Sequence, residues 1–271
     1  MRQLRKTRFV ALALVLASVG ALAAGCGGGS VPDEVQTAEY TLAPGATINV
    51  RAHNGLLTLR RSADENLRVK ATLRNPRRVR FYVLPKSGAP IQDVLVSAEL
   101  VEGPGGDAGS ELVIEVPDGA VLRTDTTNGS IDAEGLAIKD ANLITTNAPV
   151  RLRSSKGNFT ASTTNGALTI SGSEGTFWTQ TTNASIEFDG SIRTQPQSRF
   201  KTTNGDVTVR LAGSPDVRMT LKSENGAVSA DGASTISDVN RVLTARYGDG
   251  TGSLEAETTN GNVRVSLAAA P

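Results

Sequence analysis

Histidine and cysteine, which often bind metals and take part in nucleophilic catalysis, are almost absent from this sequence. Its 271 residues include one histidine, His53, and one cysteine, Cys26. A histidine-based metal cluster, a zinc ribbon and a disulfide framework each need more of these residues. A Ser-His-Asp triad could use only His53, which we expect to be a surface residue. We therefore expect no metal site and no cofactor.

Carboxylates are the remaining route to catalysis. Some β-helical enzymes cleave acidic polysaccharides with clustered carboxylates and basic residues, and glycoside hydrolysis needs two acids at a fixed separation. One column of side chains predicted to point outward contains no two neighbouring acids: Asp132, Arg151, Thr169, Glu187 and Thr208. We therefore expect no catalytic residues, and an enzyme that cleaves polysaccharides is the less favoured alternative.

A single tryptophan and a basic cluster are the candidate contacts for a ligand. Phe177 takes an inward place in the pattern described below, so Trp178 should point outward, where it could stack on a sugar ring or anchor a partner. A tryptophan covered by a loop is the alternative. Arg77, Arg78 and Arg80 belong to the densest basic cluster after residue 25 and could meet anionic polysaccharide or lipid headgroups. A solvated loop is the alternative for this cluster.

The first 25 residues are typical of an export signal. Four basic residues precede an apolar run over residues 9–24, which is shorter than the ~20 residues of a membrane span. The sequence Leu22-Ala23-Ala24-Gly25-Cys26 resembles a bacterial lipobox, although Ala23 stands where leucine is usual. We predict lipidation of Cys26 and anchoring to the bacterial cell envelope, at the outer membrane in a Gram-negative cell. A cleaved signal with a stray cysteine is the alternative.

The rest of the chain divides into a tether and a body. Residues 26–38 are expected to form a flexible tether, and residues 39–268 one body with an irregular first third over 39–120 and repeats over 121–268. Removal of residues 1–25 takes four cations with it, so 24 basic residues face 27 acidic ones and the net charge of +1 becomes −3. Nucleic acid selects a basic surface and is not an expected partner.

A tetrapeptide repeat dominates the body. Thr-Thr-Asn-Gly, or a close variant, recurs at Asn128, Asn147, Asn165, Asn183, Asn204, Asn225 and Asn260. The asparagines are 19, 18, 18, 21, 21 and 35 residues apart, and the last gap predicts a coil that lacks its marker. Residues three and five after each asparagine are apolar and the residue between them is polar, which is typical of a strand with one buried face.

The repeat favours a solenoid over hairpins. The inward positions change parity at each Asn-Gly, as a corner would require, and we expect glycine there because it tolerates a positive φ. In a meander or propeller the same pair would be a hairpin turn. The regular spacing instead predicts an all-β, single-stranded parallel β-helix (β-solenoid), right-handed, with ~18–21 residues per coil. Successive asparagines would lie about 4.8 Å apart and bond as an Asn ladder.

Four short pieces in a fixed order carry a family resemblance: Ala43-Pro44-Gly45, Asn54-Gly55, Val116-Pro117-Asp118-Gly119 and the Thr-Thr-Asn-Gly series. Over residues 40–267 the chain resembles the bacterial putative-adhesin β-strand-repeat family, a domain of unknown function. The resemblance implies a β-helix and an envelope location, and it brings no catalytic residues with it. The insertion around Arg74–Asp93 departs from the repeat.

These observations together predict a non-catalytic, membrane-anchored β-solenoid. It would present one long side for adhesion to, or binding of, polysaccharide or an envelope protein. An envelope scaffold or a stress-sensing protein is the alternative.

Overall fold

The computed structural model describes residues 32–86, 90–101 and 108–268. The predicted signal peptide, Cys26 and the first residues of the predicted tether lie outside these ranges. The described residues form 21 strands and one short 3₁₀ helix, η1, over Pro76–Arg78. No helix in the described ranges has the length and apolar character needed to cross a membrane.

The strands run in chain order as follows: β1 (Glu34–Ala52), β2 (Leu57–Arg61), β3 (Asn66–Arg74), β4 (Val79–Lys86), β5 (Ile91–Leu100), β6 (Gly109–Val116), β7 (Val121–Thr126), β8 (Ile131–Glu134), β9 (Ala137–Ile144), β10 (Val150–Arg153), β11 (Lys156–Ser162), β12 (Leu168–Gln180), β13 (Ile186–Ile192), β14 (Ser198–Lys201), β15 (Val207–Leu211), β16 (Val217–Ser223), β17 (Val228–Ala230), β18 (Ser234–Val239), β19 (Val242–Tyr247), β20 (Gly252–Thr258) and β21 (Val263–Leu267).

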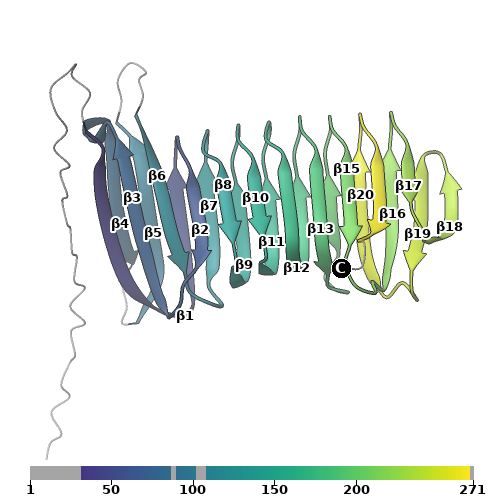
Figure 1. Ribbon diagram of the computed structural model, residues 1–271, viewed down its shortest axis with the longest axis horizontal. Helices are drawn as coiled ribbons and strands as arrows, with labels where there is room; N and C mark the ends of the chain where they lie inside the picture. The colour runs from purple at the N-terminus through teal and green to yellow at the C-terminus, as the bar shows by residue number, and fades with distance from the viewer. Residues whose placement is uncertain (1–31, 87–89, 102–107, 269–271) are drawn as a thin grey trace, which may run out of the picture.

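The strands stack as the coils of an elongated β-solenoid, seen side by side in Figure 1. Each coil contributes one strand that leads into the asparagine corner and one that follows it. The strands that follow the corner pair in parallel and in register, so that Val150, Leu168, Ile186, Val207 and Val263 form one inward row. Parallel pairing between coils confirms the solenoid and excludes a hairpin at each Asn-Gly.

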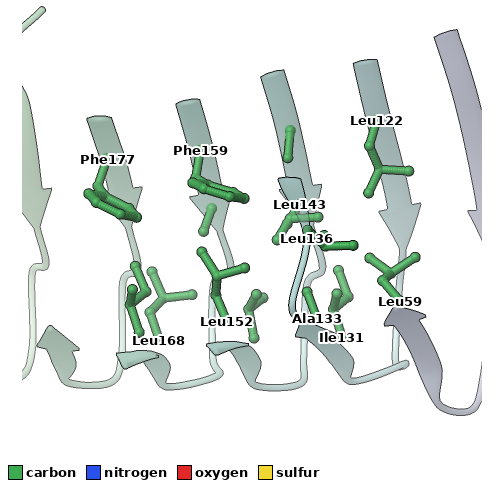
Figure 2. Close-up of a cluster of buried hydrophobic side chains, with 14 of the residues drawn as sticks. Leu59, Leu122, Ile131, Ala133, Leu136, Leu143, Leu152, Phe159, Leu168 and Phe177 are labelled. Atoms are coloured by element: carbon green, nitrogen blue, oxygen red, sulfur yellow. The ribbon is translucent and has the colours of Figure 1, made fainter. Parts of the chain in front are cut away.

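The interior is narrow and is filled by aliphatic side chains and four phenylalanines. Phe159, Phe177, Phe188 and Phe200 are buried in a continuous row, with ring centroids 5.6, 4.8 and 5.1 Å apart. Figure 2 shows Phe159 and Phe177 in this row, with Leu152 and Leu168 in a second row. The small inward side chains of the repeat therefore suit the small cross-section of a coil.

At both ends of the solenoid the coils are stacked out of chain order. Strand β1 pairs with β5 on one side and β7 on the other, so the first coil lies inside the stack. At the other end β20 lies between β14 and β16, and β21 lies between β15 and β17. Figure 1 shows the yellow strand β20 between green neighbours. The last coil of the sequence is therefore inserted between two earlier coils.

The prediction of an additional coil between Asn225 and Asn260 is wrong. Residues in this gap form the antiparallel hairpin β18–β19, and β19 pairs with β16 at the end of the stack. The 35-residue spacing arises because the chain builds this cap and then returns to insert β20 and β21.

The start of the body also differs from the sequence expectation. Strand β1 begins at Glu34, so residues 34–38 belong to the body and not to the predicted tether. They pair antiparallel with β3, where Ala38 faces Val69, and the next inward residue, Tyr40, is buried. The pairs β3–β6 and β4–β5 are antiparallel too, so the irregular first third forms a cap.

The corner asparagines form a continuous chain of amide hydrogen bonds. The side-chain amide of each donates to the amide oxygen of the next at 2.7–3.0 Å. In spatial order the chain runs Asn225, Asn260, Asn204, Asn183, Asn165, Asn147, Asn128 and Asn54. Asn260 thus lies between Asn204 and Asn225, as the inserted coil requires.

The glycine after the asparagine is needed for space and not for a positive φ at most corners. Gly129, Gly166, Gly205 and Gly226 have no positive φ; among the corner glycines only Gly55 and Gly261 have one. A Cβ at Gly166 would lie 1.8 Å from the backbone oxygen of Ala148 in the adjacent coil. Close approach of the stacked corners therefore explains the glycine.

The threonine two residues before most of these asparagines faces the interior, and its hydroxyl bonds to the corner beside it. The Thr181 hydroxyl donates to the Gly166 carbonyl at 3.0 Å, and the Thr145 hydroxyl donates to the Gly129 carbonyl at 2.9 Å. The threonines thus bond to backbone and not to one another. Thr126 is the exception, because its buried hydroxyl has no hydrogen-bond partner within the described ranges.

This exception gives a matched pair of variants. Thr181→Val should lower the free energy of unfolding by about 1–2 kcal/mol, because it leaves the Gly166 carbonyl without its partner. Thr126→Val replaces an equally buried hydroxyl that makes no bond, and it should leave stability unchanged or raise it slightly. Urea unfolding of both variants tests the difference, and equal losses would contradict the role of the hydroxyl.

Candidate functional site

Trp178 is the most prominent exposed apolar side chain on the long side of the solenoid. It lies in the second half of β12 and is 56% exposed, whereas its neighbour Phe177 is fully buried. The alternation of the strand places it outward, and no loop covers it. Register places Trp178 between Thr160 of β11 and Arg199 of β14.

A groove with a mixed apolar and polar lining runs beside Trp178 across four neighbouring strands. It has a volume of about 350 Å³, within the range of small-molecule sites. Carboxyl, amide, hydroxyl and guanidinium groups line it together with the indole. The polar lining residues are Asp140, Asn158, Thr160, Thr176, Gln197 and Arg199.

The polar groups of this groove are only partly satisfied by one another. The Asn158 amide donates to the Asp140 carboxylate at 3.0 Å. The hydroxyl of Thr176 and the Nε of Arg199 are shielded from solvent and have no partner among the described residues. Buried polar atoms of this kind are uncommon because they lose their bonds to water without gaining others.

An ion-pair network borders the groove on its β14 side. The Arg199 guanidinium lies 3.3 Å from Glu255 and 3.5 Å from Glu257, and Lys201 and Lys222 lie 3.2 and 3.5 Å from Glu257. Burial acts to raise the pKa of the Glu257 carboxyl, but the two lysines outweigh it and hold this pKa below its ordinary value. Glu257 is therefore an ionised carboxylate at neutral pH.

The arrangement of carboxylates does not resemble a hydrolytic pair. Asp132 and Glu187 are separated in register by Arg151 and Thr169, which is three strand spacings or about 14 Å. Paired acids of glycosidases lie about 5–9.5 Å apart, and one of them has a raised pKa. Glu255 and Glu257 do share one face of β20, but the lowered pKa of Glu257 opposes the acid role. No cluster of three metal-ligating side chains occurs in the described ranges.

The structure separates the two groups of predicted contact residues. Arg77 and Arg78 lie in η1 and Arg80 lies in β4, near the end of the solenoid. Strands β5, β1, β7, β9 and β11 lie between β4 and the Trp178 segment of β12, a distance of about 30 Å. Hence the arginines do not line the Trp178 groove.

His53, the one histidine, lies at a corner of the solenoid and does not line the groove. His53 is exposed at the first corner, and its carbonyl accepts a hydrogen bond from the Asn128 backbone amide at 2.9 Å. The sequence pattern did not reveal the Glu255–Glu257 network or the groove. The network depends on β20 lying beside β14, and the 35-residue gap was the only sequence signal of that insertion.

The fold and this surface define a class of protein: a β-solenoid with a groove on its long side. The family model of Toastrack DUF4097 matches residues 46–266. The chain therefore belongs to the Toastrack DUF4097 family. No functionally curated protein matches it.

Several solved structures are similar to the chain. A putative cell adhesion protein from Clostridium sporogenes is 15% identical, with a TM-score of 0.45, 88% of this chain covered and 99% of that one. A putative adhesin from Parabacteroides merdae is 8% identical, with a TM-score of 0.37 and coverage of 86% and 96%. A putative adhesin from Bacteroides fragilis is 10% identical, with a TM-score of 0.31 and coverage of 86% and 97%.

Glu257 should make the inserted coil sensitive to acid. A lowered pKa in the folded state contributes stability that is present above the ordinary glutamate pKa of about 4.3 and is lost as the pH falls through the lowered value. Glu257→Gln should therefore unfold about 2–4 °C earlier at pH 7, and the gap to the unmodified protein should narrow progressively as the pH falls below about 4.3. Thermal unfolding across this pH range measures the gap.

Glu187→Gln is the matched control, because Glu187 is an outward glutamate with no ion pair in the described part of the chain. A gap for Glu257→Gln that does not narrow as the pH falls below about 4.3 would contradict the electrostatic explanation.

Proposed function

We propose that this protein is an exported, lipid-anchored adhesion protein that binds its target on the side of the solenoid that carries Trp178. The observation that carries this proposal is a large aromatic side chain held exposed on a rigid sheet beside a groove that hydrogen-bonding groups help to line. Exposed aromatic residues with nearby hydrogen-bonding groups are typical of recognition surfaces. The proposed target is either a glycan or an envelope protein.

The proposed anchor is the lipidated Cys26. The basic and apolar segments over residues 1–24, followed by Ala24-Gly25-Cys26, support export and lipidation. Because β1 begins at Glu34, the tether would comprise residues 26–33. By the rule for flexible linkers its mean reach is about 15 Å, so the body would remain close to the membrane.

A non-catalytic role is part of the proposal. The lowered pKa of the Glu257 carboxyl and the separation of Asp132 from Glu187 support binding without turnover.

Cys26→Ser tests the anchor. The variant should move from the membrane fraction to the soluble fraction after export, because it lacks the thiol that would carry the lipid. Fractionation with metabolic labelling by a tritiated fatty acid measures both effects. A labelled or membrane-bound Cys26→Ser protein would show that the anchor lies elsewhere.

Trp178→Ala tests the binding surface. Binding of the full chain to a glycan array and to bacterial cell surfaces should fall by at least tenfold, because the substitution removes the largest exposed contact. Leu267→Ala is the control, since Leu267 is an exposed residue of β21, which belongs to the other set of strands. Equal binding by both variants would place the binding surface elsewhere.

A scaffold is a second candidate function, supported by the edge strand β18. All six residues of β18 are exposed, including Ile236 and Val239, and in the described structure this strand pairs only with β19. Unprotected edges of this kind favour pairing with another chain. The proposed occupant is the β4 edge of a second copy, whose Arg80 and Lys86 complement Asp238.

Ile236→Lys tests the scaffold. If β18 joins copies end to end, the average mass measured by light scattering should rise with concentration for the unmodified protein and stay at one copy for the variant. Thr235→Lys is the control for added charge on the same strand. A single-copy mass for the unmodified protein at all concentrations would exclude the scaffold.

A further inference from the structure

We propose that the groove beside Trp178 binds an uncharged oligosaccharide, with one sugar ring against the indole. The inference rests on the proposed function and narrows its target to one chemical class. Three independent features of the groove support it: the exposed aromatic face, the unpartnered polar atoms and the balance of charge.

The indole supplies a flat apolar surface beside hydrogen-bonding groups. Trp178 lies between Thr160 and Arg199 in register, and neither neighbour in the sheet has an aromatic side chain to stack on it. A sugar ring has one apolar face formed by its C–H groups and hydroxyl groups around its rim. Such a molecule matches an aromatic face surrounded by hydrogen-bonding groups.

The unpartnered polar atoms of the groove favour a ligand rich in hydroxyl groups. Thr176 is only 7% exposed, and its hydroxyl has no partner in the described part of the chain; the same is true of Arg199 Nε. Both atoms are shielded from solvent, so the side chains of Thr176 and Arg199 must turn toward the groove to meet a ligand. A saccharide hydroxyl, which donates one hydrogen bond and accepts two, could then serve them.

The charges near the groove disfavour an anionic ligand. Arg199, Lys201 and Lys222 are all paired with Glu255 or Glu257, which neutralises much of their charge, although the Nε–H of Arg199 has no partner among the described residues. The Asp140 carboxylate lines the groove and forms no ion pair with any described residue. A uronate would meet this negative charge without compensation, whereas a neutral sugar could donate a hydroxyl hydrogen to it.

The groove is long enough for more than one sugar. Its lining spans strands β9, β11, β12 and β14, which is three strand spacings or about 14 Å along the solenoid axis. A chain of sugars would therefore run along the stack of coils and across the strands.

The fluorescence of the protein reports on this groove directly, because Trp178 is the only tryptophan in the chain. The full chain in detergent would be titrated with cellotetraose, maltotetraose, chitotetraose and, as the anionic probe, tetragalacturonate. At least one neutral probe should shift the emission to shorter wavelength with saturation, and tetragalacturonate should bind at least tenfold more weakly. No shift with any neutral probe, or stronger binding of tetragalacturonate, would overturn the proposal.

Thr176→Val tests the role of the unpartnered hydroxyl. The variant keeps the shape of the side chain and should weaken the neutral probe about tenfold, because one hydrogen bond to the ligand is lost. Thr169→Val, an outward threonine in the other half of β12, should bind normally. Unchanged emission of the free variants would show that the groove is intact. Equal affinity of both variants would overturn the assigned contact.

Failure of this inference is distinguishable from failure of the proposed function. If cell-surface binding depends on Trp178 but no neutral saccharide shifts its emission, the target is a protein and the saccharide proposal is wrong. If cell-surface binding does not depend on Trp178, the proposed binding surface itself is wrong.

Discussion

In-register parallel pairing between coils is the constraint on which the rest of this structure depends. It repeats each type of residue above its own kind, so inward aliphatic residues meet in rows and corner amides meet at hydrogen-bonding distance. It also brings neighbouring corners so close that a side chain at Gly166 would meet the Ala148 carbonyl. Within Thr-Thr-Asn-Gly, the first threonine and the asparagine thus supply hydrogen bonds at a stacked corner, and the glycine leaves room for the adjacent corner.

The same constraint creates the recognition surface. Outward residues form rows that run along the axis, so a row can combine side chains from segments distant in the sequence. Thr160, Trp178, Arg199 and Glu255 are successive members of one such row. The surface is rigid because each of these side chains stands on a strand that is paired on both sides. A ligand would therefore lose little free energy in ordering it.

Much of the architecture could be predicted from the sequence, because the repeat reports the local period directly. The apolar residues three and five after each asparagine and the outward position of Trp178 follow from alternation alone. The order of the coils does not follow, because any coil of similar residues satisfies the same pattern. Asn204 can accept Asn225 or Asn260 equally well on local grounds, and the structure pairs it with Asn260. The ion pairs of Glu255 and Glu257 beside the groove depend on that choice.

The inserted coil changes how this solenoid can assemble. In a simple repeat protein each new coil stacks on the one made before it, and order can spread from one end to the other. Here β16 and β17 leave the ribosome before β20 and β21 but cannot dock on β14 and β15 until those last strands occupy the place between them. The final coil joins β16 and β17 to the rest of the stack, so this end of the solenoid can be completed only when nearly the whole polypeptide is present.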